Sequence, residues 1–267
     1  MLNGNAMETL TRIGFAARGL TYFTVGWLAL SSGRAEDNHG AIASLSDGGV
    51  SPLLVLMAVG FLGYAIWRLS EALIDSEGHG DNAKGIATRI GGGVSGVVHL
   101  FLALFALRLG LGWSAGGGAE RSEQGAQMAL GLPFGGVLLG IAAAALIATG
   151  LFQFLKAWRA GFTKHFDPSV AREPWVEWTG RIGYAARGLV FLVIGGFLAQ
   201  AGLSGNARDA GGVEQALAAL PSALFYVVAL GFLLFGVFSL IEARYRRITD
   251  PKVLDRLKSQ ARRARPA

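Results

Sequence analysis

Ionisable side chains lie inside the apolar segments of this chain, where they could form ion pairs or bind an anion. Arg18 and Arg187 each lie about six residues, roughly 9 Å of helix, beyond the arginine that opens their segment. Glu71 and Glu242 lie at a comparable depth in two other segments. Charged groups at such depth usually face protein or water and are paired. Three interpretations follow: arginines that extend to the lipid headgroups, structural ion pairs, or a site for a substrate or a lipid phosphate.

Other candidate groups have weaker support. His99 lies about 15 Å of helix past the start of its segment, where an imidazole could bind haem or relay protons. The apolar segments contain no second such histidine, so a hydrogen bond to a neighbouring helix is the favoured role. Arg68 follows Trp67, as in an interfacial anchor. Acids and a histidine in residues 75–81 could hold a divalent cation, but a solvated glycine-rich loop is favoured, and no metal or cofactor is predicted.

The composition indicates a membrane protein. Of the 267 residues 52% are hydrophobic and 16% are charged, against about 25% charged in soluble chains. A disordered chain and an ordinary soluble globule are therefore excluded. Six stretches have the roughly 20 apolar residues that a spanning helix needs, at 13–32, 52–73, 90–112, 133–157, 180–202 and 221–243. The chain has no cysteine and no serine-hydrolase or zinc-protease signature, so we expect no enzyme.

The six stretches form three copies of one unit. An Arg-Ile-Gly motif opens the first, third and fifth stretches, at residues 12, 89 and 181. A short segment and then a proline precede each returning stretch, with the prolines at 52, 133 and 221. Because every unit contains two spans, all three have the same topology, as in a parallel repeat. The sequence predicts an all-α fold of six transmembrane helices, arranged as three tandem hairpins with pseudo-threefold symmetry.

These motifs resemble the repeat of the DUF1206 family of bacterial integral membrane proteins. The resemblance rests on the Arg-Ile-Gly-Tyr-Ala-Ala-Arg-Gly run at 181–188 and its near copy at 12–19, and on residues 64–72 and 78–85. It covers nearly the whole chain and implies three two-helix membrane repeats, with no established activity. We expect the repeats over 1–76, 77–165 and 166–248, and a basic amphipathic tail over 249–267.

The second repeat departs from the other two at the charged positions. Ser95 stands where the other repeats have Arg18 and Arg187, and Lys156 stands where they have glutamates. The joint loss of both roles indicates that arginine and glutamate act as a pair. We therefore hypothesise ion pairs between Arg18 and Glu71 and between Arg187 and Glu242, within a hairpin or between neighbours, at about 4–6 Å.

The basic residues indicate the orientation in the membrane. With the N-terminus inside, twenty of the 24 lysines and arginines fall on the inner side. The positive-inside rule then places both termini in the cytoplasm, and we expect a bacterial inner membrane. Nine basic and two acidic residues follow position 243, so the pI near 10 describes the tail. A basic tail beside the bilayer favours the anionic cytoplasmic leaflet, and no nucleic-acid partner is expected.

The sequence favours a compact, non-enzymatic membrane module that binds lipid headgroups or a membrane protein partner. Arg18, Arg187, Arg68, Glu71 and Glu242 are the expected charge sites, for structure or for headgroups. The alternative is a channel or transporter for a small, anionic solute, with Arg18 and Arg187 facing an inner vestibule.

Overall fold

Six long helices make up most of the protein. The computed structural model describes residues 4–46, 51–75, 78–113 and 118–246. Six of its helices are long and apolar enough to cross a membrane, and they contain three of the predicted stretches and match the other three to within two residues at one end: α1 Gly4–Ser32, α3 Pro52–Ile74, α4 Ala83–Gly110, α6 Gly135–Arg159, α8 Pro174–Ser204 and α10 Ser222–Tyr245. No β-strand occurs within the described ranges. The all-α prediction is confirmed, and the predicted tail at 249–267 lies outside the described residues.

Short helices precede the returning spans, at the segments that the repeats predicted. They are α2 Asn38–Ser44, α5 Gly118–Leu130 and α9 Val213–Ala218. The 3-10 helix η2 Ala207–Asp209 precedes α9 in the same connection, and the connection between α6 and α8 contains η1 Thr163–His165 and α7 Pro168–Ala171. Asp37 caps α2, because its side chain accepts a hydrogen bond of 2.7 Å from the Gly40 N–H. Burial raises the pKa of Asp37, but hydrogen bonds from His39 and Gly40 outweigh it and the pKa falls below its ordinary value.

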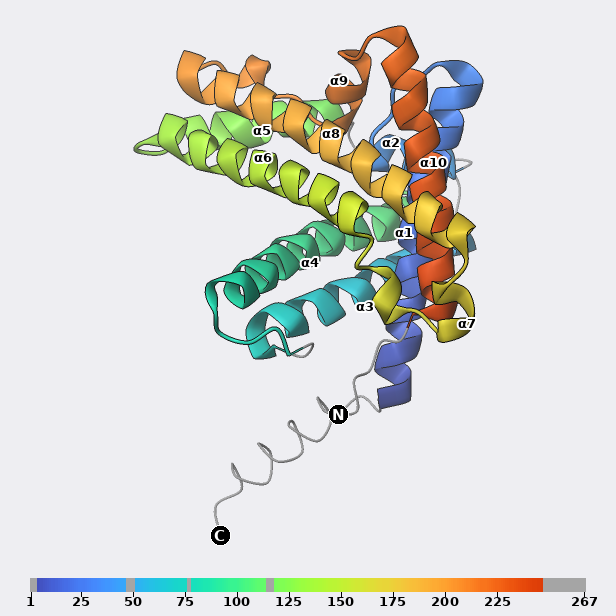
Figure 1. The fold of residues 1–267 in the computed structure, drawn as a ribbon. Helices are drawn as coiled ribbons and strands as arrows, with labels where there is room; N and C mark the ends of the chain where they lie inside the picture. The colour runs from blue at the N-terminus through green and yellow to red at the C-terminus, as the bar shows by residue number, and fades with distance from the viewer. Residues whose placement is uncertain (1–3, 47–50, 76–77, 114–117, 247–267) are drawn as a thin grey trace.

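The long helices pack as pairs contributed by different repeats. Figure 1 shows three such pairs: α1 with α10, α3 with α4, and α6 with α8. Contacts of α1 with α3 and of α8 with α10 join these pairs. The packing order is therefore α4, α3, α1, α10, α8, α6, with α4 and α6 at its two ends. In Figure 1, α4 and α6 diverge as they run away from α1 and α10.

The same small-residue contact recurs in all three pairs. A Cβ added at Gly19 would lie 3.0 Å from the carbonyl oxygen of Gly236, and one added at Gly188 would lie 2.9 Å from that of Gly150. In the third pair the corresponding distance, from Gly96 to Ala65, is 3.2 Å. Such contacts let membrane helices approach closely. Because the six residues occupy equivalent repeat positions, they support the pseudo-threefold arrangement.

The arginine of each Arg-Ile-Gly motif caps the returning helix of another repeat. The last carbonyls of a helix lack intrahelical partners, and a guanidinium can bind several of them. The three bonds to equivalent alanine carbonyls are Arg12 Nη1 to Ala243 (2.9 Å), Arg89 Nε to Ala72 (3.1 Å) and Arg181 Nη1 to Ala157 (3.1 Å). The motif thus joins each repeat to a neighbouring repeat.

The second hairpin is open, unlike the compact bundle that we expected. In the first and third hairpins Gly14 packs on Tyr64 and Gly183 on Phe235, whereas a Cβ at the equivalent Gly91 would meet nothing within 4 Å. Val94 of α4 is 62% exposed, although its equivalents Ala17 and Ala186 are 4% and 7% exposed. The equivalent face of α6, which includes Thr149, is exposed as well.

Candidate functional site

Arg18 is the centre of a buried polar cluster. It lies on α1, and its guanidinium forms an ion pair with Glu242 of α10. Its Nε donates to Ser239 Oγ at 3.2 Å, and its Nη1 donates to the Tyr64 hydroxyl at 2.9 Å. Because these partners come from α3 and α10, Arg18 connects helices of the first and third repeats. The remaining oxygen of Glu242 accepts from Arg246 at 2.7 Å.

The negative charge of Glu71 is balanced mainly by an arginine of its own helix. Arg68 Nη1 donates to it at 2.6 Å, one turn away on α3. His79 Nε2 lies 2.8 Å from its other carboxylate oxygen. The Nε of Arg68 also donates to the Tyr64 hydroxyl, at 3.3 Å. Tyr64 therefore receives hydrogen bonds from both Arg18 and Arg68 and joins the two ion-pair groups.

The two ion pairs hypothesised from the sequence are wrong. Arg18 pairs with Glu242 instead of Glu71, and Glu242 pairs with Arg18 and Arg246 instead of Arg187. The physical reason is that the closest helix contacts join different repeats. The α1–α10 contact brings the arginine of the first repeat against the glutamate of the third, which the order of residues along the chain does not reveal.

Arg187 has no anionic partner within the described part of the chain. Its Nε is buried and makes no hydrogen bond there. The guanidinium lies over three rings, with its carbon 4.6 Å from the centroid of Phe235, 5.2 Å from Tyr22 and 5.3 Å from Phe191. Arg18 lies over the same Phe235 ring at 5.2 Å, so the two arginines share one aromatic neighbour.

Lys156 on α6 is a further cation near these rings. Its Nζ lies 4.4 Å from the ring centroid of Tyr184, which packs against Phe235 at 5.3 Å. Gln153, one turn earlier on α6, is buried. We call this whole group the central polar cluster; its charged members are the carboxylates Glu71 and Glu242 and the cations Arg18, Arg68, Arg187, Arg246 and Lys156.

The other candidates have local partners. The Nδ1 of His99 lies 2.7 Å from the Ser95 carbonyl oxygen of its own helix, so the predicted hydrogen bond to a neighbouring helix is wrong. A carbonyl four residues earlier is the nearest available partner in a helix. Arg68, besides its bond to Glu71, lies 4.7 Å from the ring centroid of Trp67. Among the described residues no group of three acids or histidines is placed to hold a metal ion.

The loop after α3 is held by backbone hydrogen bonds. Asp75 accepts from the N–H groups of His79 at 2.7 Å and Gly80 at 2.9 Å. Burial raises the pKa of Asp75, but these bonds outweigh it and leave the pKa below its ordinary value. Asp81 in turn accepts from Arg89 at 3.0 Å. Residues 76 and 77 of the loop lie outside the described residues.

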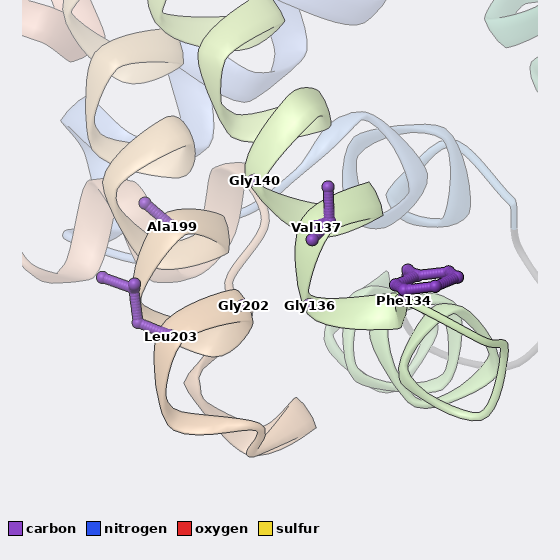
Figure 2. A pocket seen from close by; sticks show the side chains of 7 residues that line it. All are labelled: Phe134, Gly136, Val137, Gly140, Ala199, Gly202 and Leu203. Carbon is purple, nitrogen blue, oxygen red and sulfur yellow. The ribbon is translucent and has the colours of Figure 1, made fainter.

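A separate apolar depression lies between the start of α6 and the end of α8. Figure 2 shows Val137 on α6 opposite Ala199 and Leu203 on α8, with Phe134 beside them. Its lining contains no charged side chain. The central polar cluster is therefore the candidate functional site.

Sequence reasoning did not identify five members of the site: Tyr64, His79, Gln153, Ser239 and Arg246. The spacing of Arg246, four residues after Glu242, is a signal of an ion pair on one helix face. Tyr64 lies on the other helix of the same repeat as Arg18, and Ser239 lies on a helix of the third repeat, so no spacing along the chain indicates either contact.

The fold and the site define a multi-pass α-helical membrane protein built of three tandem hairpins around a buried charged cluster. The family described as Domain of Unknown Function (DUF1206) matches this chain at residues 13–75, 90–160 and 182–246. The chain is also 34% identical over 254 residues to "Uncharacterized protein YxxB" of Bacillus subtilis (strain 168), covering 90% of this chain and 92% of that protein. No solved structure matches. The chain belongs to the DUF1206 family.

Proposed function

We propose that this protein is a non-enzymatic membrane module that binds anionic lipid headgroups. The observation that supports the proposal is the charge excess of the central polar cluster, in which five cations face two carboxylates. Unpaired charges away from water are costly. A lipid phosphate offers the several acceptor oxygens that guanidinium and ammonium groups bind best.

We further propose a bacterial inner membrane, with both termini in the cytoplasm. Arg12, Arg89 and Arg181 each lie where an outgoing helix begins beside the end of a returning helix, and these connecting regions are rich in basic residues. The positive-inside rule puts these regions in the cytoplasm, against the anionic leaflet. This orientation brings the cations of the central polar cluster toward the headgroups that we expect them to bind.

Native mass spectrometry of the gently purified full-length protein tests the proposal. We expect phosphatidylglycerol to be retained and to bind about tenfold more tightly than phosphatidylcholine with the same acyl chains. Equal binding of the two lipids would contradict the proposal. Flux of a small anion in proteoliposomes that Arg187→Gln abolishes would support transport in its place, and a carboxylate-bearing membrane protein recovered in lipid-free complexes would support a protein partner.

A further inference from the structure

Each of the three helix pairs has one arginine position and one glutamate position, and the residues at these two positions differ from pair to pair. In the α1–α10 pair, Arg18 meets Glu242. In the α3–α4 pair, Ser95 replaces the arginine, and Glu71 is neutralised by Arg68. In the α6–α8 pair the arginine is kept as Arg187, but Lys156 occupies the position of the glutamate. Two of the three pairs are thus balanced by the chain itself, and the third holds two cations and no carboxylate.

The unbound Nε of Arg187 corresponds to a bound atom of Arg18. The Nε of Arg18 donates to Ser239, and its Nη2 pairs with Glu242. In the α6–α8 pair the residues at the repeat positions of Ser239 and Glu242 are Gln153 and Lys156. The buried Nε of Arg187 has no partner in the described part of the chain. The guanidinium lies over three aromatic rings, of which Phe235 is the nearest at 4.6 Å. Cation–ring contacts offset only part of the cost of burying a charge.

We propose that the phosphate of an anionic phospholipid binds between Arg187 and Lys156, at the position that the Glu242 carboxylate occupies beside Arg18. This inference rests on the proposed function and names its site. The guanidinium of Arg187, the ammonium of Lys156 and the amide of Gln153 supply donors from α6 and α8. A phosphate oxygen accepts from such donors and supplies the counter-charge that the chain lacks here.

The open second hairpin gives the occupant a place for its acyl chain. The faces of α4 and α6 that are buried in the other hairpins are exposed here and are mostly apolar: Val94, Val98, Phe101, Thr149 and Phe152. They belong to the same two-helix unit as Lys156. A free phosphate has no acyl chain and would leave these apolar faces uncovered. The site therefore fits a long-chain phospholipid that enters from the bilayer.

Restoring the missing carboxylate tests the site. In Lys156→Glu the new side chain is expected to pair with Arg187 as Glu242 pairs with Arg18, and so to displace the lipid. We expect phosphatidylglycerol to bind the variant at least about tenfold more weakly than the wild type in native mass spectrometry. We also expect the midpoint of thermal unfolding of the delipidated protein to rise. Lys164→Glu, the same charge change at an exposed residue of η1, is the matched control and should leave both quantities unchanged.

Two further variants keep the test decisive if Lys156→Glu fails to fold. Lys156→Gln and Arg187→Gln each remove one cation and should weaken phosphatidylglycerol binding without raising the unfolding midpoint. If the wild type binds phosphatidylglycerol selectively and all three variants bind it equally well, this site is wrong while the proposed function stands. If the wild type shows no selectivity, the proposed function itself fails.

A last comparison separates a lipid from a free anion. Val98→Trp on α4 should obstruct the exposed face and weaken binding of long-chain phosphatidylglycerol, while leaving all the cations in place. Inorganic phosphate at millimolar concentration should displace the lipid poorly. Strong displacement by inorganic phosphate, together with no effect of Val98→Trp, would overturn the assignment to a phospholipid.

Discussion

Removing the Glu242 carboxylate should destabilise the protein more than any exposed charge change. The ion pair of Glu242 with Arg18 is buried, with 1% and 7% of the two side chains exposed. Glu242→Gln leaves Arg18 without its counter-charge, and breaking one partner of a buried pair costs about 3–5 kcal/mol. Arg246 also loses its partner, but it is 14% exposed and can turn toward the surface, so it adds at most about 1 kcal/mol. We expect a loss of about 3–5 kcal/mol in the free energy of unfolding.

Steric trapping in lipid bicelles measures this free energy at equilibrium. Glu177→Gln is the matched control, because its pair with Arg181 is at a helix surface with 39% of the glutamate exposed, and the expected loss there is below about 1 kcal/mol. The double variant Arg18→Gln/Glu242→Gln should lose less than the sum of its single variants, by about 0.5–3 kcal/mol. A loss no larger than that of the control, or strictly additive losses, would refute the reasoning about this pair.

Three other predictions concern packing, a helix cap and the open hairpin. Gly236→Ala should lower the midpoint of thermal unfolding by the equivalent of about 1–3 kcal/mol, because a Cβ there would lie 2.5 Å from backbone of α1; Gly140→Ala, with nothing within 4 Å, should not lower it. Asp37→Ala should lower the midpoint at pH 7 by the equivalent of about 1 kcal/mol, since the cap is lost. Although burial raises the pKa of Asp37, hydrogen bonds hold it below 3.8, so the stabilisation is complete above pH 3.8 and is lost as the pH falls through the folded-state pKa. The gap between variant and wild type should therefore narrow at pH 3, and a constant gap would contradict this assignment. A spin label at Val98→Cys should collide with oxygen dissolved in the bilayer, whereas a label at the equivalent Val190→Cys should be shielded from it. The reason is that 48% of the Val98 side chain and 1% of the Val190 side chain are exposed. Equal collision rates at the two positions would mean that the second hairpin is closed.

The sequence was sufficient to predict the helices and the repeat. Apolar length gave the six spans, and the recurrence of Arg-Ile-Gly gave the three units, because these signals are local. In the sequence the arginine of that motif marks the repeat and the basic side of the spans, and its bonding partner is not indicated. Its role as a helix cap depends on which helix ends beside it in the folded protein, and for Arg12 that helix is α10.

The charged positions were recognised but their partners were not. Arg18 and Glu242 are 224 residues apart, and they meet because the last helix packs against the first. The charge reversal at Lys156 was visible in the sequence, but its meaning required the knowledge that α6 packs on α8. The open second hairpin could not be predicted either, since α4 and α6 are as apolar as helices that do pack.

An experimental structure from a lipidic mesophase, at a resolution that shows lipid headgroups, tests the central claim most directly. The account predicts phosphate density within about 3 Å of the Arg187 guanidinium and the Lys156 ammonium, with acyl-chain density along Val98 and Thr149. A structure in which α4 and α6 pack together and Arg187 pairs with a carboxylate of its own chain would contradict it.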